Sequence, residues 1–260
     1  MSDKYTEAID AKDIPSVTFP PRLVKIMIEM EKIIIHFFSS PNRIQVPFRG
    51  FLLEGPPGNG KTELARQVVR RVGEIVTTYG IKKVSFMLVD SASIAAARWG
   101  EAESRLKRLF QKSKEVDEKI VLLIDDIDCL MIKRGANVAV EWHYSINSIM
   151  FHQLDNNDPS KLIVIATSNR TDLIDDALRS RLYFYEINEL TSKELVFITK
   201  EIVRMMDIKP EQKTKLKDRI AESLTELEQL IKDGKISREN PPNIRDIQHF
   251  ITKVYIEEIL

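Results

Sequence analysis

Residues 50–62 read GFLLEGPPGNGKT. Residues 50–54 predict a short buried strand, and residues 63–71 predict the helix that follows it. Between them, residues 55–62 match the phosphate-loop pattern G-x-x-x-x-G-K-[ST] at every fixed position. Strand, loop and helix in that order are the context that this motif requires. The stretch therefore predicts a parallel-sheet α/β nucleotide-binding domain.

Each residue type in this loop suits the binding of phosphate. The glycines let successive backbone N–H groups turn inward toward phosphate oxygens, and the helix N-terminus adds its positive dipole end. Lys61 is expected to reach the β- and γ-phosphates, and the Thr62 hydroxyl is expected to ligate Mg²⁺. The predicted ligands are therefore ATP and Mg²⁺. The predicted nucleotide-binding residues are Gly55, Pro56, Pro57, Gly58, Asn59, Gly60, Lys61, Thr62 and Glu63.

The composition limits the classes of function. Lys+Arg and Asp+Glu are both 39, so no global basic field draws the chain to nucleic acid or to an anionic membrane. The most apolar stretch, residues 23–38, carries charged residues and is too short to span a bilayer, so it predicts an amphipathic helix. The single cysteine, Cys129, and the polar start favour a reducing compartment, and we expect a cytoplasmic protein without membrane insertion.

Strand and helix signals alternate along most of the chain. This alternation predicts βαβ units and a parallel sheet up to residue 188. Further strands are expected at 83–90, 120–124, 162–166 and 182–187, with helices at 103–119 and 145–154. After residue 188 only helical spacing remains, at 191–206, 211–232 and 243–260. We therefore expect a weakly structured arm at 1–16, an α/β domain at 17–188 and a small all-helical lid domain at 189–260.

A second nucleotide motif lies at residues 121–126, VLLIDD. A buried apolar strand delivers Asp125 to its carboxyl end, which is where ligands bind in open α/β sheets. Asp125 is expected to hold Mg²⁺, and Asp126 is placed to polarise the attacking water. Asp128 is interpreted as structural.

Three segments together resemble the AAA ATPases, in the branch that contains proteasomal regulatory ATPases, katanin and spastin. The segments are 55–62, 124–128 and IATSNRTDLIDDAL at 165–178, and the resemblance extends from about residue 17 to the C-terminus. It implies a helical lid and a homo-oligomeric ring, usually a hexamer, with ATP between neighbouring subunits. It also implies that Asn169 helps to position the attacking water.

By the same resemblance, the RSR sequence at 179–181 lies where the family keeps arginine fingers, which reach a neighbour's γ-phosphate. Arg181 is the first choice and Arg179 the second, although either could form a surface salt bridge. Many AAA+ proteins outside this branch also place a lid arginine at the position of Arg245, where it touches the γ-phosphate. A solvated helix arginine is the alternative there.

The chain departs from the family at the central-pore loop and at the catalytic acid. Arg98, Trp99 and Gly100 stand where relatives have an aromatic, an apolar residue and glycine. Trp99 could grip a polypeptide, stack on a base or pack under its own loop. Asp126 stands where most members have glutamate. The shorter side chain lies farther from the water, so hydrolysis could be slow.

Three functions are compatible with these features. The first is an ATP-driven motor that remodels a protein partner. The second is a nucleic-acid-associated AAA+ switch, clamp-loader-like or of the transposition-helper type, which the pore loop and Arg245 favour and the neutral charge disfavours. The third is a slow nucleotide-dependent assembly subunit, which Asp126 favours. The resemblance makes a protein substrate the favoured partner.

Overall fold

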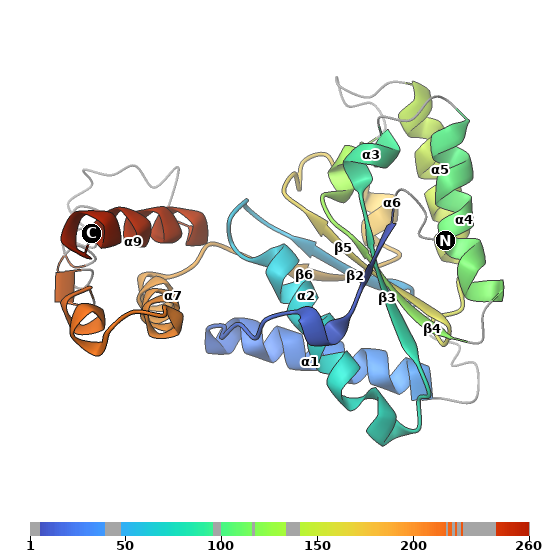
Figure 1. The fold of residues 1–260 in the computed structure, drawn as a ribbon. Helices are drawn as coiled ribbons and strands as arrows, with labels where there is room; N and C mark the ends of the chain where they lie inside the picture. The colour runs from blue at the N-terminus through green and yellow to red at the C-terminus, as the bar shows by residue number, and fades with distance from the viewer. Residues whose placement is uncertain are drawn as a thin grey trace. The chain divides into compact units, whose positions relative to one another are not determined.

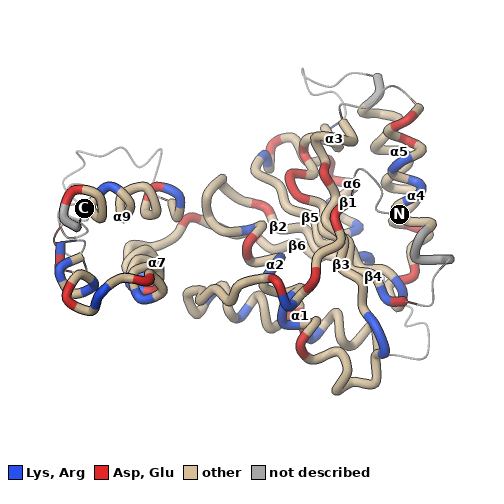
Figure 2. The backbone as a smooth tube through the Cα atoms, in the orientation of Figure 1, with Lys and Arg blue, Asp and Glu red and all other residues tan. Residues whose placement is uncertain are grey.

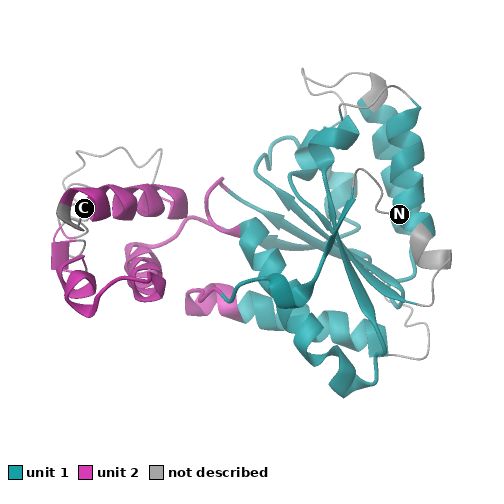
Figure 3. Cartoon of the chain, in the orientation of Figure 1, with its two compact units in different colours: residues 1–16, 25–55, 61–187 teal, residues 17–24, 56–60, 188–260 magenta. Residues whose placement is uncertain are grey.

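The computed structural model describes residues 6–39, 48–95, 100–115, 118–133, 141–216, 218–219, 222, 225 and 243–259 (Figure 1). The chain forms two compact units (Figure 3). Unit 1 comprises residues 1–16, 25–55 and 61–187, and unit 2 comprises residues 17–24, 56–60 and 188–260. The change between the units at residue 187 lies where the sequence loses its strand signals. Unit 2 also takes in the central part of the phosphate loop.

Unit 1 is built on one six-stranded sheet with the order β1-β3-β4-β5-β2-β6. All neighbouring strands run parallel except β1, which pairs antiparallel with β3. The expected parallel α/β sheet is therefore confirmed for β2 to β6, and the antiparallel β1 is an addition that was not expected. The strands are β1 Thr6–Ile9, β2 Gly50–Glu54, β3 Val84–Val89, β4 Lys119–Ile124, β5 Leu162–Ser168 and β6 Tyr183–Glu186.

Helices cover both faces of this sheet, as the unbroken apolar strands β4 and β5 require (Figure 1). Helices α1 and α2 lie on one side, and α4 and α5 lie on the other. The α4 and α5 side joins a buried core with residues of β4 and β5, such as Leu106, Met150, Leu122 and Val164. The helices and helical turns of this unit are α1 Pro21–Ser39, which begins in unit 2, α2 Lys61–Ile75, α3 Ser91–Ala95, α4 Glu101–Glu115, α5 Glu141–Asp155, α6 Asp176–Arg179, η1 Ala11–Asp13, η2 Val76–Tyr79 and η3 Ile127–Cys129.

The register of the central strands determines which residues meet at the carboxyl edge of the sheet. Glu54 pairs with Ser168, and Ile124 pairs with Ala166. Gly55, at the start of the phosphate loop, and Asp125 therefore both emerge beside the last residues of β5. This is how segments far apart in the sequence form one site.

The N-terminal segment differs from the weakly structured arm expected at 1–16. Residues 6–9 form β1 and add to the edge of the sheet, with Thr6 opposite Val89 and Ile9 opposite Phe86. The η1 turn then packs on α2 so closely that a Cβ on Gly73 would lie 2.3 Å from the Ala11 Cβ. The Gln67 side chain donates to the Pro15 carbonyl at 2.7 Å. Long-range packing, which a local pattern does not report, orders this segment.

Unit 2 contains α7 Ser192–Met205, a helical segment at residues 210–216 and α9 Ile244–Ile259. Helix α7 begins with a capping box, in which Thr191 and Glu194 satisfy each other's backbone N–H groups. Glu194 also accepts a hydrogen bond from Arg22 at 3.0 Å, which ties residues 17–24 to this unit. Of the helix expected at 211–232, residues 217, 220, 221, 223, 224 and 226–232 lie outside the described residues.

Charge is mixed in sign along the described helices. Figure 2 shows lysine and arginine interleaved with aspartate and glutamate on α4 and along unit 2. This distribution agrees with the balanced composition. Among the described segments, none of the helices has the length and apolar character needed to cross a lipid bilayer.

Candidate active site

The phosphate loop begins where β2 ends, and its first glycine is required by contact with the neighbouring segment. Gly55 has φ +149°, and a Cβ there would lie 2.2 Å from the Ile187 carbonyl oxygen. Lys61 opens α2 and is only 4% exposed. Its ammonium donates to the Gly55 carbonyl oxygen at 2.8 Å. The positive charge predicted to meet phosphate is thus held across the base of its own loop.

The middle of the loop belongs to unit 2 and meets the start of α9. Gly58 has φ +80°, which a residue with a side chain rarely adopts. Its carbonyl accepts from the Ile244 N–H at 3.1 Å, and a Cβ at this position would collide with the Asn243 side chain. Arg245 follows directly in the chain and is exposed. The lid arginine predicted from the sequence therefore lies one residue from a loop contact.

Asp125 is the centre of a hydroxyl network. Its Oδ1 accepts from the Thr62 hydroxyl at 2.7 Å and from the Thr167 hydroxyl at 2.5 Å. Its carbonyl oxygen accepts from the Ser91 hydroxyl at 2.6 Å. The structure thus brings together Thr62 and Asp125, the two residues predicted to hold Mg²⁺.

Asp126 lies in the left-handed region, with φ 48° and ψ 55°. Aspartate and asparagine tolerate this region better than most residues. The Asp126 N–H donates to the Thr167 hydroxyl at 3.1 Å, and Asp126 Oδ1 accepts from the Asn169 amide at 2.6 Å. Asp126 and Asn169, predicted from separate segments to act on the same water, are therefore in direct contact.

Asp128 holds the segment that carries Asn169. Its Oδ1 accepts from the Ser168 hydroxyl at 2.6 Å and from the Asn169 N–H at 3.2 Å. The carboxylate therefore fixes the backbone of the segment that carries Asn169. The geometry is that of the structural residue expected from the sequence.

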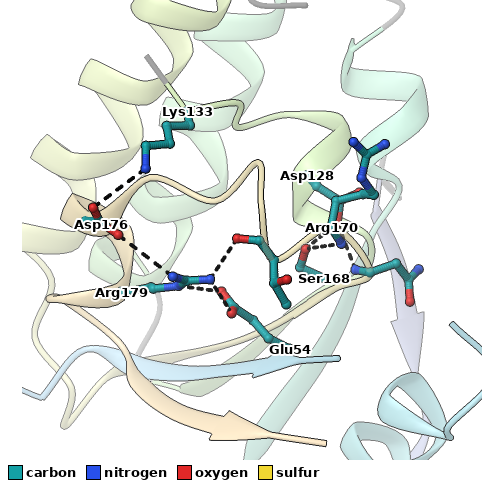
Figure 4. A network of polar contacts seen from close by, with 9 residues as sticks. Glu54, Asp128, Lys133, Ser168, Arg170, Asp176 and Arg179 are labelled. Atoms are coloured by element: carbon teal, nitrogen blue, oxygen red, sulfur yellow. Dashed lines mark hydrogen bonds and ion pairs between the residues drawn. The ribbon is translucent and has the colours of Figure 1, made fainter. Parts of the chain in front are cut away.

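Both candidate finger arginines are engaged within the chain. Arg179 makes a forked contact with Glu54, at 3.1 and 2.7 Å, and donates to the Thr171 carbonyl at 2.8 Å (Figure 4). Arg181 makes a forked contact with Asp155, at 2.8 and 2.9 Å, and its guanidinium carbon lies 4.8 Å from the centre of the Phe151 ring. The hydrogen bonds between Arg181 and Asp155 raise the pKa of Arg181 and lower the pKa of Asp155.

The residues present fit a magnesium nucleotide. The Asn59 Nδ2 is buried and has no hydrogen-bond partner among the described residues, so the loop holds a donor that suits an anionic ligand. Thr62 and Asp125 offer hard oxygen ligands, and Mg²⁺ commonly takes only one or two protein ligands when phosphates and waters supply the others.

The comparison with known families agrees with this geometry. Residues 51–190 match the family described as "ATPase family associated with various cellular activities (AAA)". The chain belongs to the AAA ATPase family. The match includes the phosphate loop, Asp125, Asp126, Asn169 and the arginine pair, so the resemblance seen in the motifs is confirmed.

Named relatives are larger proteins. The AAA ATPase is 33% identical over 134 residues to the ATPase family gene 2 protein of Schizosaccharomyces pombe, a match to 52% of this chain and 15% of that protein. It is 34% identical over 151 residues to the cell division control protein 48 homolog B of Arabidopsis thaliana, 55% of this chain and 23% of that protein. It is 32% identical over 154 residues to the ATP-dependent zinc metalloprotease FtsH of Heterosigma akashiwo, 56% of this chain and 21% of that protein. The matched region is thus less than a quarter of each of these relatives.

The fold is also found among solved structures. A chain in the structure of the HORMA:CdnC:Trip13 complex of E. coli MS115-1 superposes with a TM-score of 0.69. It covers 92% of this AAA ATPase and 83% of that chain, at 16% sequence identity. At that identity the likeness establishes the fold alone.

The remaining predicted residues of the AAA ATPase lie near the start of helices or outside the described part. Glu63, in the first turn of α2, accepts from the Gln67 side chain at 2.8 Å. Gly100 precedes α4 with φ +86° and is exposed. Arg98 and Trp99, the rest of the predicted pore loop, lie outside the described residues.

Among the described residues of the site, those not predicted from the sequence include Thr167, Glu54 and Asp155. Thr167 bridges Asp125 and the Asp126 N–H, while Glu54 and Asp155 hold the two arginines. Thr167 could have been found from the sequence, because a hydroxyl at the end of a buried strand needs a polar partner, which the neighbouring strand can supply. The partners of the arginines depend on the folded chain.

Replacing Thr167 with valine is expected to weaken the affinity of the AAA ATPase for Mg²⁺. The change removes a donor to Asp125 and an acceptor for the Asp126 N–H at nearly constant shape. Partners behind a metal ligand contribute about tenfold to hundredfold in metal affinity, so the Mg²⁺ concentration for half-maximal turnover should rise by roughly tenfold. A Mg²⁺ titration of ATP turnover measures this.

Thr199→Val is the matched control, since Thr199 is buried and its hydroxyl donates to a helix carbonyl of unit 2, that of Leu195, at 2.8 Å. The control should titrate like the unmodified chain. An unchanged Mg²⁺ titration for a folded Thr167→Val chain would show that Thr167 does not support the metal ligand.

Proposed function

We propose that this AAA ATPase binds and hydrolyses Mg²⁺-ATP at the interfaces of an oligomeric ring and couples turnover to the remodelling of a protein partner. The observation that carries the proposal is the direct contact of four predicted residues: Thr62 with Asp125, and Asp126 with Asn169. Family membership supports ATP chemistry. Relatives named as an ATP-dependent protease and as a homolog of cell division control protein 48 favour a protein substrate.

Each residue of the site has a distinct role in the proposal. Lys61 exchanges the Gly55 carbonyl for phosphate oxygens when nucleotide binds, and Thr62 and Asp125 hold the metal ion. Asp126 orients the attacking water and accepts its proton, while the Asn169 amide keeps the carboxylate in place. The metal ion, when bound, neutralises charge on the phosphates. Arg245, at the start of α9, is proposed to contact the γ-phosphate; it follows Ile244, whose N–H donates to the Gly58 carbonyl.

A second candidate is a slow nucleotide-dependent assembly subunit. It is favoured by Asp126, whose short carboxylate is already bonded to Asn169 at 2.6 Å. The rate of ATP turnover distinguishes the two candidates. A remodelling motor should show turnover that a protein substrate accelerates, whereas an assembly subunit should turn over slowly with or without one.

The partner class is tested by binding in the presence of ATP. An unfolded polypeptide and a single-stranded DNA, each labelled with a fluorophore, are offered to the Asp126→Asn chain, which is expected to retain ATP. The proposal requires ATP-dependent binding of the polypeptide. Binding of the DNA alone would favour the nucleic-acid-associated switch instead, which the mixed charge along the described chain does not favour (Figure 2).

The ring is tested by mixing two inactive variants. In the proposal Arg181 acts on a neighbour, and its partner Asp155 is 51% exposed, so release of the pair costs little. Arg181→Ala and Lys61→Ala chains should each be inactive. When mixed, some interfaces pair an intact Arg181 with an intact nucleotide site, and a measurable fraction of ATP turnover should return.

The control for this experiment is Arg170→Ala, which removes an exposed arginine paired with Asp172 and should leave turnover unchanged. Co-assembly is verified by light scattering. If the mixtures remain inactive although the chains co-assemble, Arg181 does not act on a neighbouring subunit. If turnover does not depend on protein concentration and the active species has the size of a monomer, the proposal of a ring is refuted.

A further inference from the structure

Arg179 has a different environment from Arg181, although both were candidates for the same role. It closes α6 and points back at the sheet, toward the end of β2 (Figure 4). Its Nε and Nη2 form the fork on Glu54, and Nη2 also donates to the Thr171 carbonyl. Asp176 lies 3.8 Å from Nη1, and the Phe184 ring lies beneath the guanidinium with its centre 5.9 Å away.

The two groups that Arg179 joins belong to the two sides of the nucleotide site. Glu54 is the residue before Gly55, whose carbonyl receives Lys61. Thr171 follows Asn169 by two positions in the segment that leaves β5. The guanidinium therefore connects the base of the phosphate loop with the segment that carries Asn169, inside unit 1. A displacement of either side by about 1 Å can cost roughly a hundredfold in rate.

The burial of the partner decides whether each arginine can leave its contact. Glu54 is 1% exposed, so withdrawing Arg179 would leave a buried carboxylate without its cation. Breaking such a pair shifts an equilibrium by roughly a hundredfold to several thousandfold. Asp155, the partner of Arg181, is 51% exposed and is hydrated when released. Arg181 also donates to the Ala177 carbonyl at 2.8 Å, so leaving would break this bond and the contact with Phe151 as well. It would leave no buried carboxylate unpaired, however, whereas the departure of Arg179 would.

We propose that Arg179 is a positioning residue for its own subunit's nucleotide site, through Glu54 and Thr171, and is not an arginine contributed to a neighbour. This rests on the proposed ATP site. The Glu54–Arg179 pair fixes the end of β2, and with it the Gly55 carbonyl and Lys61, relative to the Asn169 segment. Among the two arginines, the trans-acting role falls to Arg181.

The first test compares Glu54→Gln, Arg179→Gln and the double variant. Glu54→Gln leaves the Arg179 guanidinium without its carboxylate, and Arg179→Gln leaves the Glu54 carboxylate without its cation. Each single variant should therefore raise the Kd for a fluorescent ATP analogue by roughly tenfold. Because the two residues act as one unit, the double variant should be no weaker than the single variants. The measurement is made at concentrations where the chain is dispersed, so that no neighbour can contribute.

Two further variants separate positioning from loss of folding. Arg179→Lys keeps the positive charge beside Glu54 but cannot form the fork, so it should show the same direction of change with a thermal unfolding midpoint closer to that of the unmodified chain. Asp176→Asn is the matched control and should bind the analogue normally, because it keeps the fork on Glu54 and weakens only the 3.8 Å contacts of Asp176 with Arg179 and Lys133. Normal affinity of folded Arg179→Gln and Glu54→Gln chains would overturn the proposal.

The second test repeats the mixing experiment with Arg179→Gln in place of Arg181→Ala. If Arg179 acts within its own subunit, the Arg179→Gln chains have an intact Lys61 but a defective nucleotide site, and the Lys61→Ala chains have no functional site. Mixing the two should therefore restore no turnover. Recovery comparable to that of the Arg181→Ala mixture would overturn the proposal. If instead the unmodified chain fails to bind the analogue, the proposed ATP site is refuted. That result differs from normal binding by the Arg179 variants, which would refute only the positioning role of Arg179.

Discussion

Lys61→Ala should abolish ATP binding at concentrations that saturate the unmodified chain. Lys61 is 4% exposed, and its ammonium donates to the Gly55 carbonyl oxygen at 2.8 Å, so the charged group is held at the loop in a buried residue. Truncating one member of a buried hydrogen-bonded charge pair costs about 2 to 5 kcal/mol, which corresponds to roughly thirtyfold to several thousandfold in Kd. Binding of a fluorescent ATP analogue measures this.

Lys107→Ala is the control for Lys61→Ala, because Lys107 is an exposed lysine on α4. It should bind the analogue normally. The variant chains are compared by circular dichroism, since Lys61→Ala also leaves the Gly55 carbonyl without this donor. Unchanged affinity in a folded Lys61→Ala chain would refute the assignment of the loop.

Asp126→Asn should stop ATP turnover while binding survives. The amide cannot accept a proton, and the loss of a general base typically lowers the rate by about 10²- to 10⁴-fold. Asparagine is the suitable replacement because it tolerates the left-handed backbone at φ 48° as well as aspartate does. The turnover rate and the Kd for the ATP analogue are measured on the same preparation.

Asp172→Asn is the matched control, since Asp172 is an exposed carboxylate paired with Arg170 in the segment after β5. Its turnover should equal that of the unmodified chain. Turnover retained by Asp126→Asn would mean that another group activates the water. Loss of both binding and turnover would assign Asp126 to nucleotide affinity instead.

Asp126→Glu asks why this chain lacks the glutamate that most members of the family carry. The backbone is left-handed, a region that glutamate tolerates less well than aspartate, and the Asn169 amide is already 2.6 Å from the carboxylate. The longer side chain should therefore crowd Asn169 and lower the turnover rate. An increase would show that the shorter carboxylate limits the rate in the natural sequence.

Local patterns predicted most of the strands and helices of unit 1. The strands expected at 50–54, 120–124 and 162–166 occur at Gly50–Glu54, Lys119–Ile124 and Leu162–Ser168. Such runs are apolar on both sides because the parallel sheet is covered on both faces, so they can be recognised without knowing their neighbours. Among the strands the exception is β1, whose residues carry no strand signal and are ordered by pairing with β3. The short helices α3 and α6 were not predicted either.

Motifs likewise predicted Lys61, Thr62, Asp125, Asp126 and Asn169 as members of one site. Each is fixed by spacing within a short segment or by its place at the end of a strand. The order of the strands, β1-β3-β4-β5-β2-β6, was not predictable, because it depends on which strands pair and not on the character of any one strand. That order and its register place Thr167 beside Asp125.

The amino-acid sequence alone determined that this chain has a phosphate loop after a buried strand, an acidic pair at the end of another, and a helical C-terminal part. These follow from residue types over a few consecutive positions, where local geometry dominates. The tertiary structure alone decided the partners of the arginines. Arg179 and Glu54 are 125 positions apart, and only the folded sheet shows that one arginine is held by a buried carboxylate and the other by an exposed one.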